Sequence, residues 1–315
     1  MTRVGAIDCG TNSIRLLIAD VVPGSLHQVH REMRIVRLGH GVDATGRIGA
    51  EPMARTLAAA ADYAAQCQEA GCEAVRFVAT SASRDATNAA DFVTGVQEAF
   101  AAFGTAPEVI SGQEEASLSF AGATTGLQGA PAPHLVVDIG GGSTEFVRGT
   151  DRVEQAVSVD IGCVRMTERH LRSDPPTEAE IWPALGDITV AVNSAAEQVD
   201  LTGVGTLVGV AGSVTTVTAH ALGLGAYRPE QIHGAELSVE QAIAACTDLV
   251  QMSRADRAAL PFMHEGRVDV IGAGALVWRS IIQRLQHDSG LTTVRASEHD
   301  ILDGIALSQA APSAG

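Results

Sequence analysis

Two short segments that combine aspartate with glycine constrain the fold of this chain more than any other feature. They read A-I-D-C-G-T-N-S from Ala6 to Ser13 and V-V-D-I-G-G-G-S-T-E from Val136 to Glu145. In each, an apolar run ends in aspartate, glycine and hydroxyl residues follow, and a second apolar run begins at once, which predicts strand, tight turn and strand. Glycine lets a ligand approach the backbone, and successive N–H groups in a turn form an anion-binding concavity. The pair therefore predicts two phosphate-binding loops that face each other, one at the start of each half.

The candidate ligand-binding residues follow from these turns and from a later G-V-A-G-S-V-T-T segment. Those expected to contact phosphate through N–H or hydroxyl groups are Gly10, Thr11, Asn12, Ser13, Gly140, Gly141, Gly142, Ser143, Thr144, Gly212 and Ser213. For the last two residues, close packing of a helix on a strand is an equal alternative. The carboxylates of Asp8, Asp138 and Glu145 suit a hydrated divalent cation that accompanies phosphate, so we expect Mg²⁺ or Mn²⁺.

Charge excludes several classes of function. All 21 basic residues are arginine, and the formal net charge is -16 at pH 7. Without lysine there is no P-loop and no Schiff-base chemistry. The acidic balance argues against general binding of nucleic acid or of anionic membranes. A phosphate ligand held by backbone amides, arginine and a divalent metal is compatible with it.

Length and composition indicate a soluble two-domain protein of the cytoplasm. The 315 residues suffice for two cores, and with 46% hydrophobic but only 3% aromatic residues these cores must consist of Ala, Val, Leu and Ile. No apolar run approaches the roughly 20 residues that span a bilayer. We expect no signal peptide, because a strand-like segment begins almost at once. The five cysteines lack zinc-type spacing and are expected to be buried cytosolic thiols.

The order of predicted elements repeats. Residues 1–125 read β-β-β-α-β-α-β-α, and Gly126 to His134 has the composition of a linker. The pattern then restarts with strands over residues 134–139, 143–148 and 152–159. Two domains are therefore expected, 1–125 and 126–315, the second with extra helices that include one over residues 267–285 and a terminal one over 301–310.

Once both loops are placed, a family resemblance can be stated. The motifs occur in this order: D-C-G-T-N-S-I-R-L-L-I, T-S-A-S-R-D-A, S-G-Q-E-E-A, D-I-G-G-G-S-T-E-F, D-I-G, G-V-A-G-S-V-T-T, I-H-G and R-V-D-V-I-G-A-G. With them the chain resembles the exopolyphosphatase and guanosine pentaphosphate phosphohydrolase family, in its short two-domain form. That family belongs to the superfamily of acetate and sugar kinases, actin and heat-shock chaperone ATPases.

The resemblance implies a fold and an activity. The implied fold is α/β, with two ribonuclease-H-like (actin-like ATPase) domains, each with a mixed five-stranded sheet flanked by helices, and an active site in the cleft between them. The implied reaction is metal-dependent removal of the terminal phosphate from linear polyphosphate, or of the 5'-γ-phosphate from guanosine pentaphosphate. The sequence does not choose between the two substrates or between a monomer and a homodimer.

The resemblance also assigns catalytic candidates. Glu115 matches the glutamate that acts as the catalytic base, and its neighbour Glu114 is a further candidate, although on a helix it points about 100° away. Arg84 is the expected counter-charge to the terminal phosphoryl group, and Arg15 is a weaker candidate because it lies within a strand. From pattern alone, Glu115 reads as a solvated glutamate in a first helical turn, and Arg84 as the partner of Asp85 in a surface ion pair.

One departure from the family pattern leaves the substrate preference open. Where the family often reads like S-x-x-G-L-R-x-G, this chain has S-E-H-D-I-L-D-G from Ser297 to Gly304, and the arginine is missing. The alternatives are an ATP-binding kinase or actin-like module and a non-catalytic phosphate sensor. His233 is expected to be a hydrogen-bonding loop residue, and Asp43, Asp160 and His264 receive no role.

Overall fold

The computed structural model describes residues 1–127 and 129–310, which divide into two compact units. Unit 1 contains Met1–Thr125 together with the segment that begins at Asp300, and unit 2 contains Gly126–His299. The sequence had placed all residues after 125 in the second domain, so the assignment of the C-terminal segment is corrected. Across the residues described, no helix combines the length and the apolar character that a membrane crossing requires.

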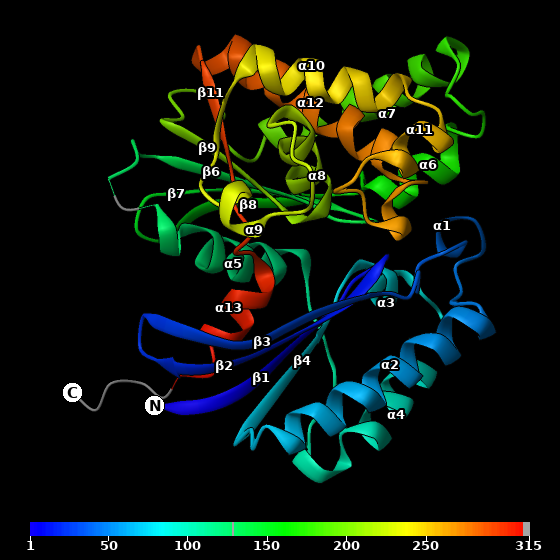
Figure 1. The fold of residues 1–315 in the computed structure, drawn as a ribbon, viewed down its shortest axis with the longest axis vertical. Helices are drawn as coiled ribbons and strands as arrows, with labels where there is room; N and C mark the ends of the chain where they lie inside the picture. Colours follow the sequence, from blue (N-terminus) through cyan, green and yellow to red (C-terminus); the bar gives the residue numbers. More distant parts are fainter. Residues whose placement is uncertain (128, 311–315) are drawn as a thin grey trace. The chain divides into compact units, whose positions relative to one another are not determined.

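Unit 1 is built on a five-stranded mixed sheet (Figure 1). Its strands are β1 (Thr2–Cys9), β2 (Ser13–Val22), β3 (Ser25–Ile35), β4 (Ala74–Ala79) and β5 (Glu108–Val109), in the spatial order β3-β2-β1-β4-β5. The first three strands form the antiparallel meander that the sequence predicts, whereas β1, β4 and β5 are parallel. The carboxyl ends of these three parallel strands therefore meet at one edge of the sheet.

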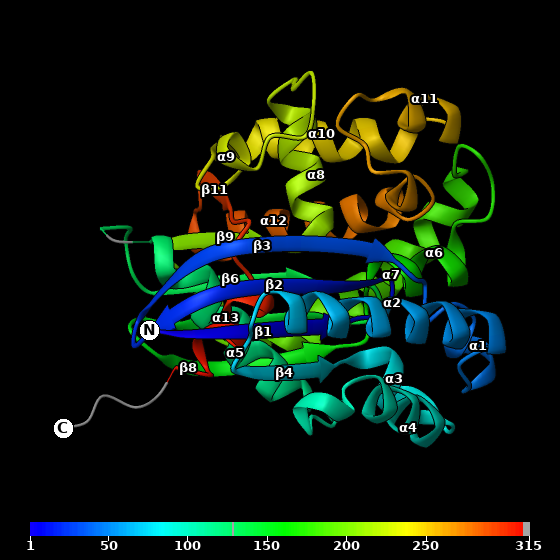
Figure 2. The same cartoon turned by 60° about the horizontal axis from the view of Figure 1, so that its bottom comes forward.

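The alternation of side chains along β1 gives this sheet two apolar faces. Ile7 and Cys9 pack toward α2 (Ala50–Glu69) and α4 (Ala89–Ala99), which lie on the same side of the sheet (Figure 2). Val4 and Ala6 point to the opposite face, where α5 (Gly112–Ala123) and α13 (Ile301–Leu307) complete the core. Both faces are thus buried within one unit.

The terminal helix α13 belongs to unit 1 because it packs on α5 without room for side chains between the backbones. A Cβ added to Gly304 would lie 2.0 Å from the carbonyl oxygen of Leu118, and one added to Gly122 would lie 1.9 Å from that of Asp300. Leu302, which occupies the position of the missing arginine, is 1% exposed in this core. These contacts join segments far apart in sequence, which local patterning cannot predict. The segment 311–315 lies outside the described residues.

Because Gly304 contacts backbone, we expect Gly304→Ala to destabilise the protein by about 2 kcal/mol or more, since overpacking of a close contact costs roughly 1–3 kcal/mol. Gly186 offers a matched control, because it lies inside a helix where a Cβ would meet nothing within 4 Å. Gly186→Ala should stabilise the protein by about 0.5–1 kcal/mol through helix propensity. Urea unfolding of both variants measures the difference, and equal stabilities would contradict the packing argument.

Unit 2 repeats the same strand order and adds one strand at the edge. Its strands are β6 (His134–Ile139), β7 (Thr144–Gly149), β8 (Val153–Val159), β9 (Thr206–Val210), β10 (Glu236–Ser238) and β11 (Thr293–Ala296). The spatial order is β10-β11-β9-β6-β7-β8, so the sheet has six strands where five were expected. The added strand, β10, is a three-residue antiparallel neighbour of β11, too short to leave a periodic pattern.

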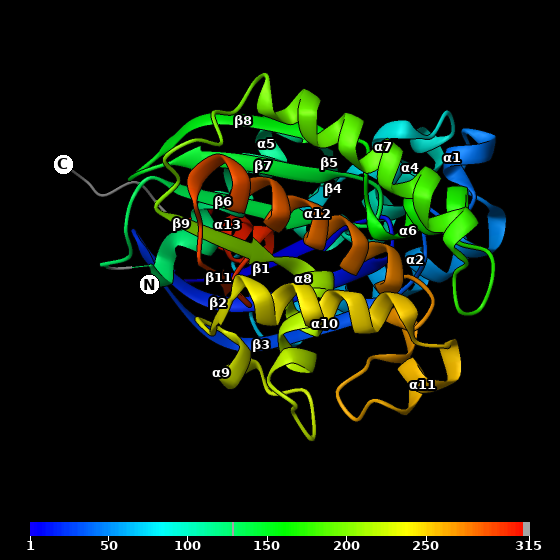
Figure 3. The same ribbon diagram turned by 90° about the horizontal axis from the view of Figure 1, so that it is seen from above.

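The helices of unit 2 build its core, and α10 and α12 run alongside each other (Figure 3). The longer ones are α6 (Cys163–His170), α7 (Glu178–Ala196), α8 (Ala211–Ala221), α10 (Val239–Gln251) and α12 (Ile271–Ser289). Thr177 caps α7 in a capping box with Glu180, as its position in the sequence predicts. However, α12 does not begin at Arg267, because Glu265–Arg267 forms a separate 3-10 turn that the His264 side chain caps.

Further short helices connect the main elements. They are α1 (Val42–Thr45) and α3 (Ser81–Asp85) in unit 1, and α9 (Pro229–Ile232) and α11 (Arg254–Ala259) in unit 2. Of these, α3 matters most for function because it follows β4 directly at the edge where the parallel strands of unit 1 end.

Candidate active site

The first loop is a tight turn at the carboxyl end of β1. The N–H of Gly10 donates to the carbonyl of Ser13 at 2.9 Å and closes the turn. Thr11 Oγ1 lies 2.8 Å from the hydroxyl of Ser81, the first residue of α3. The N–H of Thr80 donates to the carbonyl of Cys9 at 3.1 Å, so the loop after β1 and the helix after β4 are joined directly. Ligands of open α/β sheets bind at such an edge.

A buried charge cluster lies next to this loop. Asp8 and Arg15 are opposite each other in the β1–β2 register, and Arg15 donates to one carboxylate oxygen of Asp8 from Nε at 2.9 Å and from Nη2 at 2.6 Å. Arg15 also forms an ion pair with Asp300, the N-cap residue of α13. Arg15 was the weaker arginine candidate because it lies within a strand, and Asp300 was not a candidate at all.

The two carboxylates of this cluster respond differently to their surroundings. Burial raises the pKa of Asp8 above its ordinary value, against the opposing effect of Arg15. Burial acts in the same direction on Asp300, but Arg15 and Arg31 outweigh it, and the pKa of Asp300 lies below its ordinary value. Asp300 is therefore held as an anion, whereas Asp8 is the less stable anion of the two.

These opposite pKa shifts predict a pH dependence of stability. Because the folded-state pKa of Asp300 is lowered, its stabilising contribution is fully present above about pH 4, the usual titration range of a free aspartate, and is lost as the pH falls further. The raised pKa of Asp8 has the opposite effect on stability, because the cost of burying the ionised Asp8 carboxylate disappears as the carboxyl group is protonated at lower pH. We expect Asp300→Asn, which keeps a helix cap, to lower stability at pH 7 and to flatten its decline below about pH 4. Urea unfolding across pH measures both effects, and an unchanged slope would contradict this assignment.

The candidate base Glu115 lies in the first turn of α5, after the parallel strand β5. It is 8% exposed, and Arg84 of α3 forms an ion pair with it at 3.2 Å between Nη1 and Oε2. The same Nη1 donates to the carbonyl of Ile110 at 3.1 Å. Arg84 thus pairs with Glu115, which the sequence did not suggest.

Glu114 does not share this environment. Its side chain is 46% exposed and forms an ion pair with Arg76 at 2.7 Å. The backbone N–H of Glu114 donates to the hydroxyl of Ser111, the N-cap residue of α5. Of the two adjacent glutamates, the structure pairs Glu115 with Arg84 and Glu114 with Arg76. A catalytic role for Glu114 stays a prediction.

Two buried polar atoms near the first loop lack a partner. Within residues 1–127 and 129–310, Asn12 Oδ1 and Ser83 Oγ make no hydrogen bond. Ser83 is 1% exposed and belongs to α3, one residue before Arg84. A buried polar atom without a partner costs about 1–3 kcal/mol, and such atoms are typical of sites that bind a ligand. Ser83 is therefore an added candidate, marked in the sequence only by the hydroxyl-rich T-S-A-S-R-D segment.

The second loop, in unit 2, has the same turn at the carboxyl end of β6. The N–H of Gly140 donates to the carbonyl of Ser143 at 3.0 Å. The carbonyls of Gly140 and Gly141 accept from the first N–H groups of α6, and Arg165 donates to the carbonyl of Gly142 at 2.7 Å. A Cβ on Gly162 would lie 2.4 Å from Gly141, so glycine is required for this approach. The loop is thus held rigidly by α6.

Ser143 and Thr144 close the second loop and are buried. Ser143 is 1% exposed and Thr144 is fully buried. The hydroxyl of Thr144 donates to the carbonyl of Ile161, so this side chain supports the loop rather than offering a free hydroxyl to phosphate. That Thr144 contacts phosphate through its N–H or hydroxyl group stays a prediction.

Asp138 and Glu145 form the acidic part of unit 2. They are opposite each other in the β6–β7 register and are 6% and 1% exposed. Ser158, in register on β8, donates to Glu145 Oε1 at 2.7 Å. Directly opposed residues on neighbouring strands have Cβ atoms about 4.5–5.5 Å apart. A divalent cation would offset the charge of two such carboxylates.

The acidic residues fit magnesium in the way proteins usually hold it. Among the described residues there is no group of three or more His, Cys, Asp or Glu side chains able to hold a metal. Magnesium does not need one, because it commonly binds one or two carboxylates, several waters and the phosphates of its substrate. Asp138 and Glu145 meet this requirement in unit 2, whereas Asp8 of unit 1 has its Oδ2 committed to Arg15.

The G-V-A-G-S-V-T-T segment is explained largely by packing. A Cβ on Gly212 would lie 2.3 Å from the guanidinium of Arg267, and one on Gly274 would lie 2.2 Å from the hydroxyl of Ser213. Arg267 donates to the carbonyl of Gly212 and to Thr216 Oγ1, both at 3.1 Å. The structure therefore favours the packing alternative for Gly212 and Ser213, and adds Arg267 as a basic group that the sequence did not single out.

The remaining polar residues have local roles. His264 accepts from the N–H of Gly266 at 3.1 Å, and Asp160 lies 3.8 Å from Arg165. His233 Nδ1 accepts from the N–H of Glu298 at 3.3 Å, in agreement with its expected role as a hydrogen-bonding loop residue, and its ring lies 4.3 Å from that of His299.

Comparison with known proteins identifies the family of this chain. The model of the Ppx/GppA phosphatase family matches residues 17–309. A protein named Exopolyphosphatase 2 from Mycobacterium tuberculosis (strain CDC 1551 / Oshkosh) is 50% identical over 98% of this chain and 99% of its own length. The resemblance inferred from the motifs is thereby confirmed.

Solved structures show the same similarity. A crystal structure of an exopolyphosphatase-like protein is 44% identical, with a TM-score of 0.94, and covers 98% of each chain. The Ppx-GppA enzyme of Aquifex aeolicus is 29% identical, with a TM-score of 0.80, over 98% of this chain and 99% of that one. The two mixed sheets flanked by helices agree with the expected actin-like ATPase class. From the family match, the full-length relative and the shared fold, we conclude that this chain belongs to the Ppx/GppA phosphatase family.

Proposed function

We propose that this protein is an exopolyphosphatase, which hydrolyses the terminal phosphoanhydride bond of linear polyphosphate and releases orthophosphate with the help of Mg²⁺ or Mn²⁺. The observation that carries the proposal is the buried carboxylate of Glu115, paired with Arg84 at 3.2 Å beyond the carboxyl ends of parallel strands. The name of the relative that is 50% identical over its full length supports the choice of substrate.

The residues of this chain suit the chemistry that such a reaction needs. Hydrolysis of a phosphoanhydride requires a positioned water, a base that orients or deprotonates it, and neutralisation of phosphate charge. Glu115 supplies the carboxylate, and Arg84 beside it adds positive charge. The turns at Gly10–Ser13 and Gly140–Ser143, one in each unit, are each closed by the N–H of their first glycine. Donors to phosphate would therefore come from the N–H groups that follow that glycine in each turn. A bound divalent ion, held by Asp138 and Glu145, would supply further charge neutralisation.

Phosphate release from polyphosphates of several lengths and from guanosine pentaphosphate, each with Mg²⁺, Mn²⁺ or a chelator, tests this function. We expect metal-dependent release from polyphosphate with a higher kcat/KM than from guanosine pentaphosphate. A preference for guanosine pentaphosphate would assign the second family activity instead. Phosphate transfer from ATP to a sugar or acid, without polyphosphate hydrolysis, would favour a kinase.

A further inference from the structure

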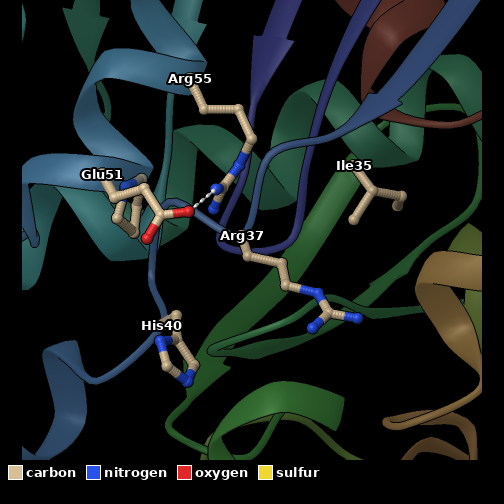
Figure 4. Close-up of a pocket in the computed structure, with 6 residues that line it drawn as sticks. Ile35, Arg37, His40, Glu51 and Arg55 are labelled. Carbon is tan, nitrogen blue, oxygen red and sulfur yellow. Dashed lines mark hydrogen bonds and ion pairs between the residues drawn. The ribbon is translucent and has the colours of Figure 1, made fainter.

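A basic cavity opens in unit 1 next to the first loop. Its volume is about 410 Å³, and its lining residues are Ile35, Arg37, His40, Glu51, Pro52 and Arg55. Figure 4 shows Arg37, His40 and Arg55 around it, with Glu51 joined to Arg55. The lining contains two arginines and a histidine but only one glutamate, in a chain whose formal net charge is -16. This local excess of basic groups is the reverse of the overall balance and suits an anionic ligand.

The backbone ties this cavity to the first loop. The N–H groups of Val36 and Arg37 both donate to the carbonyl of Asn12, at 3.0 and 2.8 Å. Arg37 has a φ of 51°, in the left-handed region that residues other than glycine seldom adopt. Such a conformation persists only where surrounding contacts hold it, and it is common at ligand-binding positions. The turn at Gly10–Ser13 therefore also fixes the position of the Arg37 backbone, because the carbonyl of Asn12 binds the N–H groups of Val36 and Arg37.

The second arginine comes from helix α2 and has a weak acidic partner. Arg55 donates from Nε to the carbonyl of Val36 at 2.9 Å, and from Nη1 to Glu51 at 3.2 Å. The Glu51 side chain is 90% exposed, and exposed ion pairs of this kind contribute little. A phosphate group can accept two parallel N–H bonds from a guanidinium, and would compete well with Glu51 for Arg55.

We propose that this cavity is a subsite for a non-terminal phosphate group of linear polyphosphate, bound by Arg37 and Arg55 with His40 at its rim. The inference rests on the proposed exopolyphosphatase function and adds to it a determinant of chain-length preference. A phosphate further along the chain would be bound here, apart from the phosphoryl group that is released.

The test compares KM for long-chain polyphosphate in Arg37→Gln, Arg55→Gln, Glu51→Gln and the control Arg152→Gln, an exposed arginine of unit 2. Each cavity arginine that is replaced removes one charge-assisted hydrogen bond, so KM should rise by about tenfold. The value of kcat should stay unchanged. Glu51→Gln should lower KM by severalfold, a gain that misfolding cannot produce. Arg152→Gln should match the wild type. Unchanged KM in all three cavity variants, with wild-type hydrolysis intact, would overturn the subsite while leaving the proposed function standing.

Direct titration separates failure of the subsite from failure of the function. Polyphosphate and, separately, inorganic phosphate are titrated into wild-type and variant protein in the presence of a chelator, so that binding is measured without turnover. Weaker polyphosphate binding in Arg37→Gln and Arg55→Gln supports the subsite even if the wild type releases no phosphate. If inorganic phosphate binds as tightly as polyphosphate and is lost in the same variants, the cavity is a product site and the proposal is wrong.

Discussion

Glu115→Gln is expected to lower kcat for phosphate release from polyphosphate by about 10²–10⁴-fold, the usual contribution of a general base. Glutamine keeps the shape of the side chain and can still accept from Arg84, but it cannot take a proton from water. The fold should persist, because Glu115 lies at the start of α5 and its backbone bonds are retained. Phosphate-release kinetics and circular dichroism measure the two properties.

The neighbouring glutamate provides a matched control for this variant. Glu114→Gln changes the same residue type one position away, where the side chain is 46% exposed and pairs with Arg76. Its kcat should stay within about twofold of the wild type, since an exposed ion pair contributes little. Comparable losses in the two variants would mean that Glu115 has no special role, and full activity in Glu115→Gln would remove it as the base.

Arg15→Met should strongly destabilise unit 1. It leaves the carboxylates of Asp8 and Asp300, 4% and 3% exposed, without the guanidinium that joins them. Breaking a buried ion pair from one side typically costs about 3–5 kcal/mol, because an uncompensated charge stays buried. Chemical unfolding with urea measures the loss.

Two comparisons make this prediction specific. Arg3 and Asp20 are opposite each other in the same pair of strands, as Arg15 and Asp8 are, but the Arg3 side chain is 37% exposed. Arg3→Met should therefore cost far less than Arg15→Met. Combining Arg15→Met with Asp8→Asn and Asp300→Asn should recover most of the loss, because no buried charge then lacks a partner. A triple variant as unstable as Arg15→Met would show that packing of the arginine stem, not charge, sets the cost.

The sequence predicted those features that depend on neighbouring residues. The strand-turn-strand segments, the repeated strand order and the cap at Thr177 all follow from local patterns, and the structure confirms them. The pairing of Arg15 with Asp8 is predictable from the sequence, because a tight turn between β1 and β2 fixes a register in which these two residues are opposite each other. A position within a strand therefore does not exclude a residue from the site, since the register of a hairpin can bring it opposite a residue close to the loop.

What the sequence did not predict depends on long-range packing. Asp300 joins Arg15 across 285 positions of the chain, and α13 packs on α5 through glycines whose spacing carries no signal of its own. Arg267 lies in a 3-10 turn before α12 and donates to the carbonyl of Gly212, 55 positions earlier in the chain. In each case the decisive contact is between residues far apart in the chain.

The return of α13 to unit 1 has a consequence for how the protein is made. Residues 1–125 leave the ribosome first, yet one face of their sheet is covered by a helix that begins at Ile301. Unit 2 is continuous from Gly126 to His299, so all of its sequence is available before α13 is synthesised. Domains usually fold in the order of synthesis, at about 5–20 residues per second. Here unit 1 begins first but needs a helix that is synthesised after all of unit 2, so the part of its apolar face that α13 covers stays exposed until α13 has been made.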